Sequence, residues 1–175
     1  MGTERGQEEE RPPHRMFVDP FELGVCAEAL RKGPVVVYFF PAAHTGGCNL
    51  EAHTFAKNKA KFDLVGATII GVSRDSIKQL NDFSSDQQYC AGKFPVASDP
   101  DGAIAQSYDL QVMNLNRVVK TTRGEDVDYA LTERTTFVIT PDSKLVATLS
   151  WADDKITPVE HVERPLAIVE GLRKK

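Results

Sequence analysis

The stretch VVVYFFPAAHTGGCNLEAHTF, residues 35–55, decides the fold class of this chain. Its first six residues form a continuous β-branched and aromatic run, which is typical of a strand buried on both faces of a sheet. A seven-residue loop follows, and residues 48–62 then place Ala52, Phe55 and Phe62 on one face of a helix. A fully buried strand that leads into a helix predicts an α/β domain.

The rest of the chain alternates strands and helices in the same way. The expected elements are a short helix at 26–33, a buried strand at 67–73, a helix at 75–90 capped by Ser73 or Asp75, a short strand at 94–99, a short helix at 101–110, a β-hairpin at 135–150 and a C-terminal helix. That last helix should begin near Val162, because Pro165 then lies in its first turn, where a missing N–H matters least. Residues 111–133 predict only an irregular strand and an exposed loop. This order predicts a central mixed β-sheet with helices on both faces.

Composition indicates a single domain. Of the 175 residues, 41% are hydrophobic and 26% are charged, which suffices for one full-sized core at residues 16–175. Residues 1–15 hold charges and prolines without core-forming residues, and we expect them to form a disordered arm. The net charge of −4, with scattered basic residues, argues against nucleic-acid binding. No apolar run reaches the ~18 residues of a membrane helix, so we expect no membrane association.

The cysteines Cys26, Cys48 and Cys90 form an odd set without regular spacing. Such a set argues against a disulfide framework and a zinc site, and it favours a reducing, cytoplasmic compartment or reactive thiols. Cys48 opens a helix directly after a strand and loop, where unpaired amides and the helix dipole favour a negative charge. From this context alone, Cys48 fits a reactive thiolate and a buried apolar filler equally well.

The loop before Cys48 has the side chains that a reactive thiol needs. Thr45 can cap the helix and aim its hydroxyl at a ligand beside the sulfur. Gly46 and Gly47 let backbone N–H groups approach closely, because neither has a Cβ. Pro41 ends the strand and can separate the sulfur from bulk water. These residues therefore predict a ligand site around Cys48.

Pro41, Thr45 and Cys48 together read P-x-x-x-T-x-x-C, which resembles the peroxidatic motif of the peroxiredoxins. Further stretches resemble the peroxiredoxin Q, or bacterioferritin-comigratory, subgroup of that family: VVVYFF, IIGVSRDS, FPVASDPDGAIAQSYDL and RTTFVITPDSKLV. The resemblance extends over roughly residues 25–172, with several motifs in consistent order. It implies a thioredoxin-like fold and an antioxidant peroxidase that reduces hydrogen peroxide or organic hydroperoxides without a metal or other cofactor.

The resemblance also implies a role for each motif residue. Cys48 would be the nucleophile that becomes a sulfenic acid, and Thr45 would hydrogen-bond the peroxide. Pro41 would shield the sulfenic acid, and Arg134 would stabilise the thiolate and the charge that develops on the leaving oxygen. Fixed donors are effective in this task, and a guanidinium is always protonated. The expected partners are the peroxide and a thioredoxin-like or other thiol reductant.

Three departures from the subgroup affect the expected mechanism. Many members have a resolving cysteine five residues after the nucleophile, where this chain has His53. Cys90 is then the candidate resolving cysteine, provided that the Cys48 helix unwinds locally, and a one-cysteine mechanism is the alternative. Cys26 is a weaker candidate. Gly46 replaces the usual proline after Thr45, and the N-terminal region lacks the usual A-P-x-F opening.

Two other functions remain open at this point. The protein could be a redox sensor, in which Cys48 reacts once and then modifies a partner protein. Alternatively, the fold could serve as a non-catalytic chaperone or interaction module. The residue set Pro41, Thr45, Cys48 and Arg134 favours the enzyme. We expect a monomer or a weak homodimer.

Overall fold

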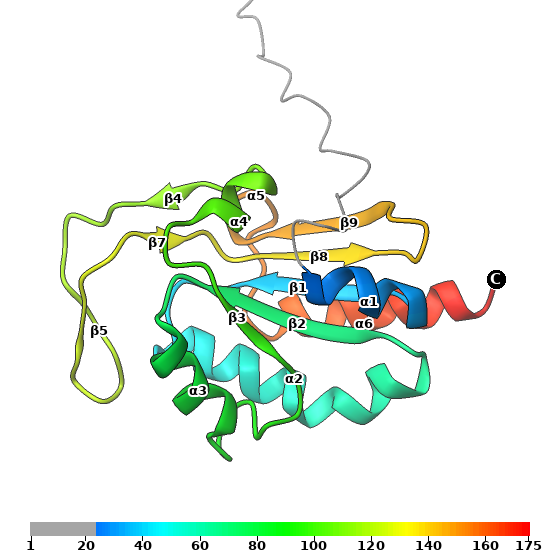
Figure 1. Ribbon diagram of the computed structural model, residues 1–175, viewed down its shortest axis with the longest axis horizontal. Coiled ribbons are helices and arrows are strands. Elements are labelled where there is room, and N and C mark those ends of the chain that lie inside the picture. Colours follow the sequence, from blue (N-terminus) through cyan, green and yellow to red (C-terminus); the bar gives the residue numbers. More distant parts are fainter. Residues whose placement is uncertain (1–23) are drawn as a thin grey trace, which may run out of the picture.

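The computed structural model describes residues 24–175, and its centre is a five-stranded sheet in the order β3-β2-β1-β8-β9 (Figure 1). The strands are β1 (Val35–Phe39), β2 (Thr68–Ser73), β3 (Val96–Ser98), β8 (Thr135–Ile139) and β9 (Leu145–Ser150). β1, β2 and β3 run parallel, whereas β8 is antiparallel to both β1 and β9. The predicted mixed sheet is therefore confirmed. The arm predicted at residues 1–15 lies outside the described residues.

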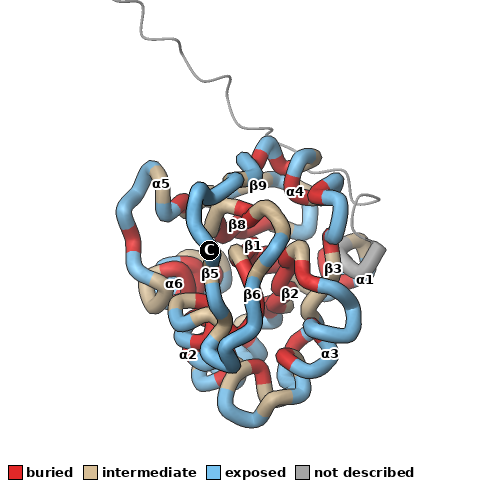
Figure 2. The backbone as a smooth tube through the Cα atoms, turned by 90° about the vertical axis from the view of Figure 1, so that its left-hand side faces the viewer, coloured by how far each residue is buried: buried red, intermediate tan, exposed pale blue. Residues whose placement is uncertain are grey.

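Helices cover both faces of this sheet, as the sequence predicts. They are α1 (Gly24–Lys32), α2 (Gly46–Leu64), α3 (Ile77–Ser85), α4 (Ala103–Ser107), α5 (Trp151–Asp154) and α6 (Glu160–Arg173). One core cluster joins the sheet to α2, α3 and α6, and a second joins its other face to α1 and α4. Figure 2 shows the buried residues concentrated on the central strands.

The continuous apolar run of β1 is explained by these two clusters. Val36 and Tyr38 belong to the first cluster, whereas Val37 and Phe39 belong to the second, so both strand faces are buried. Tyr38 lies opposite Gly71 of β2, where a Cβ atom would lie 2.9 Å from the tyrosine ring. The glycine therefore leaves room for the largest side chain on that face.

Three details of the helices differ from the sequence prediction. The cap of α3 is Ser76, which forms a capping box with Gln79, rather than Ser73 or Asp75. α3 ends at Ser85, so Cys90 lies in the turns that follow it and not near the end of a helix. α6 begins at Glu160, two residues before the predicted start, which places Pro165 beyond the first turn.

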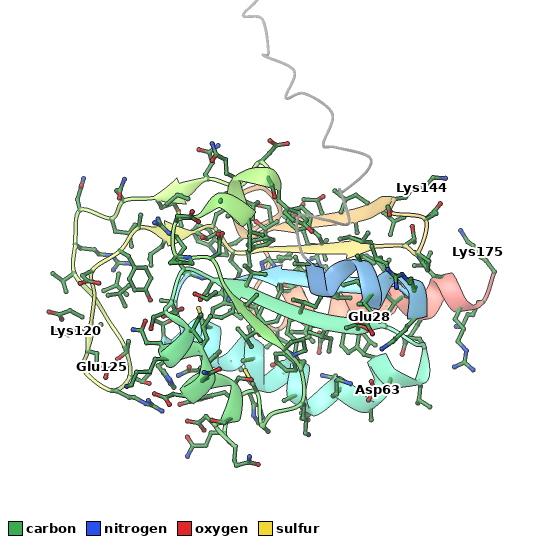
Figure 3. All side chains as sticks on the ribbon, viewed as in Figure 1. Glu28, Asp63, Lys120, Glu125, Lys144 and Lys175 are labelled. Atoms are coloured by element: carbon green, nitrogen blue, oxygen red, sulfur yellow. The ribbon has the colours of Figure 1, made fainter. Side chains whose placement is uncertain are left out.

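Residues 111–133 contain more structure than the sequence predicts. Two short antiparallel pairs form there, β4 (Val112–Met113) with β7 (Leu131–Thr132), and β5 (Val119–Lys120) with β6 (Asp126–Val127). The β5–β6 hairpin lies at the opposite end of the molecule from the C-terminus of α6 (Figure 1). Figure 3 shows Lys120 and Glu125 on this hairpin. Its residues are mainly exposed, which explains why hydrophobic patterning did not reveal the pairing.

Candidate active site

Cys48 is the third residue of α2, in the first turn after the loop that leaves β1. Its side chain is 1% exposed and belongs to the larger core cluster. The first intrahelical bond runs from the Asn49 N–H to the Thr45 carbonyl, 2.8 Å away. The sulfur therefore lies at the positive end of a 19-residue helix, in a site closed to bulk water.

Arg134 lies directly against this sulfur. Its Nη2 donates to Cys48 Sγ at 3.3 Å, although the two residues are 86 positions apart in the sequence. Gly47 makes this approach possible, because a Cβ atom at that position would lie 3.1 Å from Arg134 Nη2. Arg134 is only 11% exposed in its side chain, so the guanidinium is held in place rather than solvated.

Glu51 completes the group and was not assigned a role from the sequence. Its Oε2 accepts from Arg134 Nη1, and its side chain is fully buried one helical turn after Cys48. Burial raises the pKa of Glu51 to about 7, although the Arg134 guanidinium acts in the opposite direction. Its other oxygen, Oε1, has no hydrogen-bond partner among residues 24–175. The i, i+3 spacing from Cys48 was the available signal, since it places both residues on one helix face.

Thr45 occupies the N-cap position of α2, but its side chain makes no capping hydrogen bond. The predicted cap by this hydroxyl is therefore wrong. The hydroxyl donates instead to the Ala42 carbonyl at 2.7 Å. Because a hydroxyl has one proton, its oxygen keeps lone pairs that can accept a further hydrogen bond. Pro41 is half-buried and lies two residues after the end of β1.

Cys90 has a different environment from Cys48. It is fully buried in the same core cluster, and both residues are free thiols. Burial raises the pKa of Cys90 to about 12, with Asp86 acting in the same direction. His53, on an exposed face of α2, places its Nδ1 3.0 Å from the Gln88 carbonyl oxygen. This contact links α2 to the turns that hold Cys90. Cys26 lies within α1.

Neither a metal cluster nor a spanning helix is found in the described part of the chain. Residues 24–175 hold no group of three or more His, Cys, Asp or Glu side chains that could bind a metal ion. No helix in that range is long and apolar enough to cross a membrane.

Comparison with known proteins identifies the family. Residues 24–148 match the AhpC/TSA family. Peroxiredoxin Bcp from Xanthomonas campestris is 32% identical over 140 residues, which are 80% of this chain and 78% of that protein. Peroxidoxin BcpB from Mycobacterium tuberculosis has a similar structure, with a TM-score of 0.68 and 28% identity over 83% of this chain and 84% of that one.

One solved structure from Xanthomonas campestris is described by a reaction. A structure of the Xanthomonas campestris bacterioferritin comigratory protein, described in terms of its alkyl peroxide reduction activity, has a TM-score of 0.64 and 30% identity, over 81% of each chain. The sheet with helices on both faces is thus the thioredoxin fold of these peroxiredoxins, as the resemblance in sequence implies. The chain therefore belongs to the AhpC/TSA family, in which it is similar to the Bcp and peroxiredoxin Q peroxiredoxins.

Proposed function

We propose that Cys48 is the residue on which this thiol peroxidase performs its reaction. One observation carries the proposal: the Cys48 sulfur lies at the N-terminus of a long helix and also receives a hydrogen bond from the buried guanidinium of Arg134. Both features favour the charged thiolate, which is the nucleophilic form of cysteine. A cysteine that merely filled the core would have neither feature.

The proposed step transfers one oxygen atom from the peroxide to sulfur. The thiolate attacks one peroxide oxygen, an S–O bond forms and the O–O bond breaks, so that sulfur is oxidised and the peroxide is reduced. The attacked oxygen keeps its hydrogen and becomes the hydroxyl of the Cys48 sulfenic acid. The leaving oxygen takes up a proton from solvent, equal to the one that the Cys48 thiol released on ionising, and departs as water or an alcohol. Arg134 stabilises the negative charge on the leaving oxygen, because its donors are in place before the charge develops.

Thr45 and Pro41 have supporting roles in this proposal. Since the Thr45 hydroxyl proton is engaged by the Ala42 carbonyl, its oxygen is oriented to accept a hydrogen bond from the peroxide O–H. This bond would hold the peroxide in line for attack by Cys48. Pro41 lies at the start of the same loop, where it limits access of water to the sulfenic acid.

The substrate and reductant follow from the same chemistry. We assign hydrogen peroxide or organic hydroperoxides as the substrate, in keeping with the alkyl peroxide reduction activity named for the Xanthomonas campestris relative. A thioredoxin-like or other thiol then reduces the sulfenic acid. In a two-cysteine cycle, Cys90 would resolve the sulfenic acid by forming a disulfide with Cys48. In a one-cysteine cycle, the external thiol would reduce the sulfenic acid directly. The buried position of Cys90 means that α2 or the turns after α3 must open before the two sulfurs can meet. A monomer or weak homodimer in the cytoplasm stays a prediction.

Mass analysis after one equivalent of peroxide tests the proposal. In a Cys26→Ser background, we expect the chain to gain one oxygen on Cys48 or to form a Cys48–Cys90 disulfide. Cys48→Ser should abolish both products and all turnover with thioredoxin and its reductase, whereas Cys90→Ser should stop turnover only if Cys90 resolves. Peroxide consumption by Cys48→Ser at the parent rate would refute the assignment. A single turnover followed by a stall would favour a sensor.

A further inference from the structure

The loop before α2, which presents Thr45 and Cys48, contains a residue other than glycine in a left-handed backbone conformation. His44, directly before Thr45, has a φ of 58°, in the left-handed region that side chains with a Cβ rarely adopt. Its side chain is 4% exposed and stacks edge-on against Phe83 and Tyr89. Such a conformation persists only where the surrounding structure holds it in place.

Backbone hydrogen bonds hold the loop on both sides of this residue. On the N-terminal side, the Ala43 N–H donates to Asp75 Oδ2 at 2.9 Å. On the C-terminal side, the His44 carbonyl accepts from the Thr122 N–H at 2.7 Å, which belongs to the β5–β6 hairpin. The direction in which the chain enters α2, and thus the position of Thr45 relative to the Cys48 sulfur, depends on these two contacts.

Of these two contacts, the one to the Asp75 carboxylate is the more specific, because this carboxylate joins three segments of the chain. It follows the end of β2, is 1% exposed, and accepts from Ala43, from Ser73 Oγ at 2.5 Å and from the hydroxyl of Tyr129. A buried carboxylate is costly unless its oxygens are hydrogen-bonded, and here both oxygens receive donors. No active-site feature predicted from the sequence uses this residue.

We propose that Asp75 is a positioning residue for the peroxide reaction of Cys48, which it influences through the Ala43 amide and the left-handed turn at His44. Among the described residues its carboxylate accepts hydrogen bonds from Ala43, Ser73 and Tyr129 and none from Cys48, so its effect is on geometry. The inference rests on the proposed function of Cys48. Without the carboxylate, the turn at His44 relaxes toward ordinary backbone angles, and Thr45 and the start of α2 move away from the arrangement that binds the peroxide.

Asp99 provides a matched control within the same sheet. It is 2% exposed, follows β3 as Asp75 follows β2, and accepts two backbone N–H bonds, from Ile104 at 3.0 Å and from Ala105 at 2.9 Å. Those amides belong to α4, on the sheet face opposite Cys48. Substituting Asp99 thus removes a comparable buried carboxylate without touching the active-site loop.

The test measures the second-order rate constant for sulfenic acid formation at Cys48 by quenched mass analysis. Asp75→Ala should lower this rate constant at least about tenfold, because small misplacements of reacting groups have large effects on rate. Asp99→Ala should change it less than about threefold. Asp75→Asn, which keeps the size and one carbonyl oxygen, should fall between the parent and Asp75→Ala, and it replaces the alanine variant if that one does not fold.

A rescue experiment separates positioning from general destabilisation. Asparagine is one of the few residues other than glycine that visit the left-handed region routinely, so His44→Asn should restore several-fold of the rate lost in the Asp75 variant. The same change in the Asp99 variant should give no gain. Equal rates for the Asp75 and Asp99 variants, or an equal effect of His44→Asn in both, would overturn the inference. If the parent itself formed no sulfenic acid at Cys48, the proposed function would fail instead.

Discussion

Cys48 and Cys90 occupy the same core cluster and are almost equally inaccessible, with exposures of 1% and 0%. Their surroundings nevertheless differ in the donors and charges around the sulfur, which govern how readily a thiolate forms. The Cys48 sulfur receives a hydrogen bond from Arg134 at the start of a helix, whereas the Cys90 thiol lies among apolar groups near the negative charge of Asp86. Burial alone therefore does not distinguish the two thiols. The fixed donors around the Cys48 sulfur do, because burial without donors disfavours the thiolate, and the proposed reactivity of Cys48 rests on this difference.

Alkylation should show the largest difference between the two thiols. Because burial raises the pKa of Cys90 to about 12, whereas Arg134 donates a hydrogen bond to the Cys48 sulfur, we expect iodoacetamide to modify Cys48 at least about 10³-fold faster. Peptide mapping of the Cys26→Ser protein over time measures both rates. In 8 M urea the two rates should become similar, which serves as the control. Comparable alkylation rates in the folded protein would show that the two thiols do not differ in reactivity.

Removal of the Arg134 donor should bring Cys48 closer to the behaviour of Cys90. Because a single substitution would leave Glu51 buried without its partner, the informative variant combines Arg134→Gln with Glu51→Gln. We expect its rate of sulfenic acid formation to fall about 10²–10³-fold, the usual effect of losing one transition-state donor. Glu51→Gln alone retains the donor and is the control. If the double variant reacted as fast as that control, Arg134 would have no role in the reaction.

The third and smallest effect concerns the pH dependence of stability around Cys48. The pKa of Glu51 rises from 4.5 to about 7 on folding, so between these values the folded protein binds more protons than the unfolded chain. The free energy of unfolding should therefore fall as pH rises from about 4.5 to about 7, and the slope should vanish above that range. This fall in the free energy of unfolding should amount to roughly 1–3 kcal/mol, and Glu51→Gln should remove it.

Urea unfolding of the parent and Glu51→Gln at pH 5 and pH 8 measures that contribution as a difference. His161, whose pKa burial lowers to about 4 with Arg134 acting in the same direction, contributes an opposite pH dependence. It is present in both proteins and cancels in the difference. Identical pH slopes for the two proteins would show that Glu51 stays ionised on folding.

Several parts of this molecule were predictable because their cause is local. The run at residues 35–40 predicted a doubly buried strand, and the packing of its alternate residues into two clusters confirms it. The Pro-Asp-Ser-Lys turn likewise lies between β8 and β9. By contrast, the Thr45 cap was wrong, because the hydroxyl is placed to donate to the Ala42 carbonyl and its oxygen accepts from no N–H of α2. The direction in which such a side chain points depends on loop geometry, which the residue types leave open.

The order along the chain of the five central strands and of the helices α1 to α4 and α6, the family, and the place of Cys48 at the start of a helix followed from the sequence by itself, since each depends on periodicity or on residues close together in the chain. The family resemblance implied a role for Arg134 at Cys48, but the hydrogen bond between them, the pairing of Arg134 with Glu51 and the hydrogen bond from the Ala43 N–H to Asp75 were decided only by the tertiary structure. The physical reason is that a hydrogen bond between residues 86 positions apart requires the sheet to bring two strand ends together. No local preference of either residue encodes that distance.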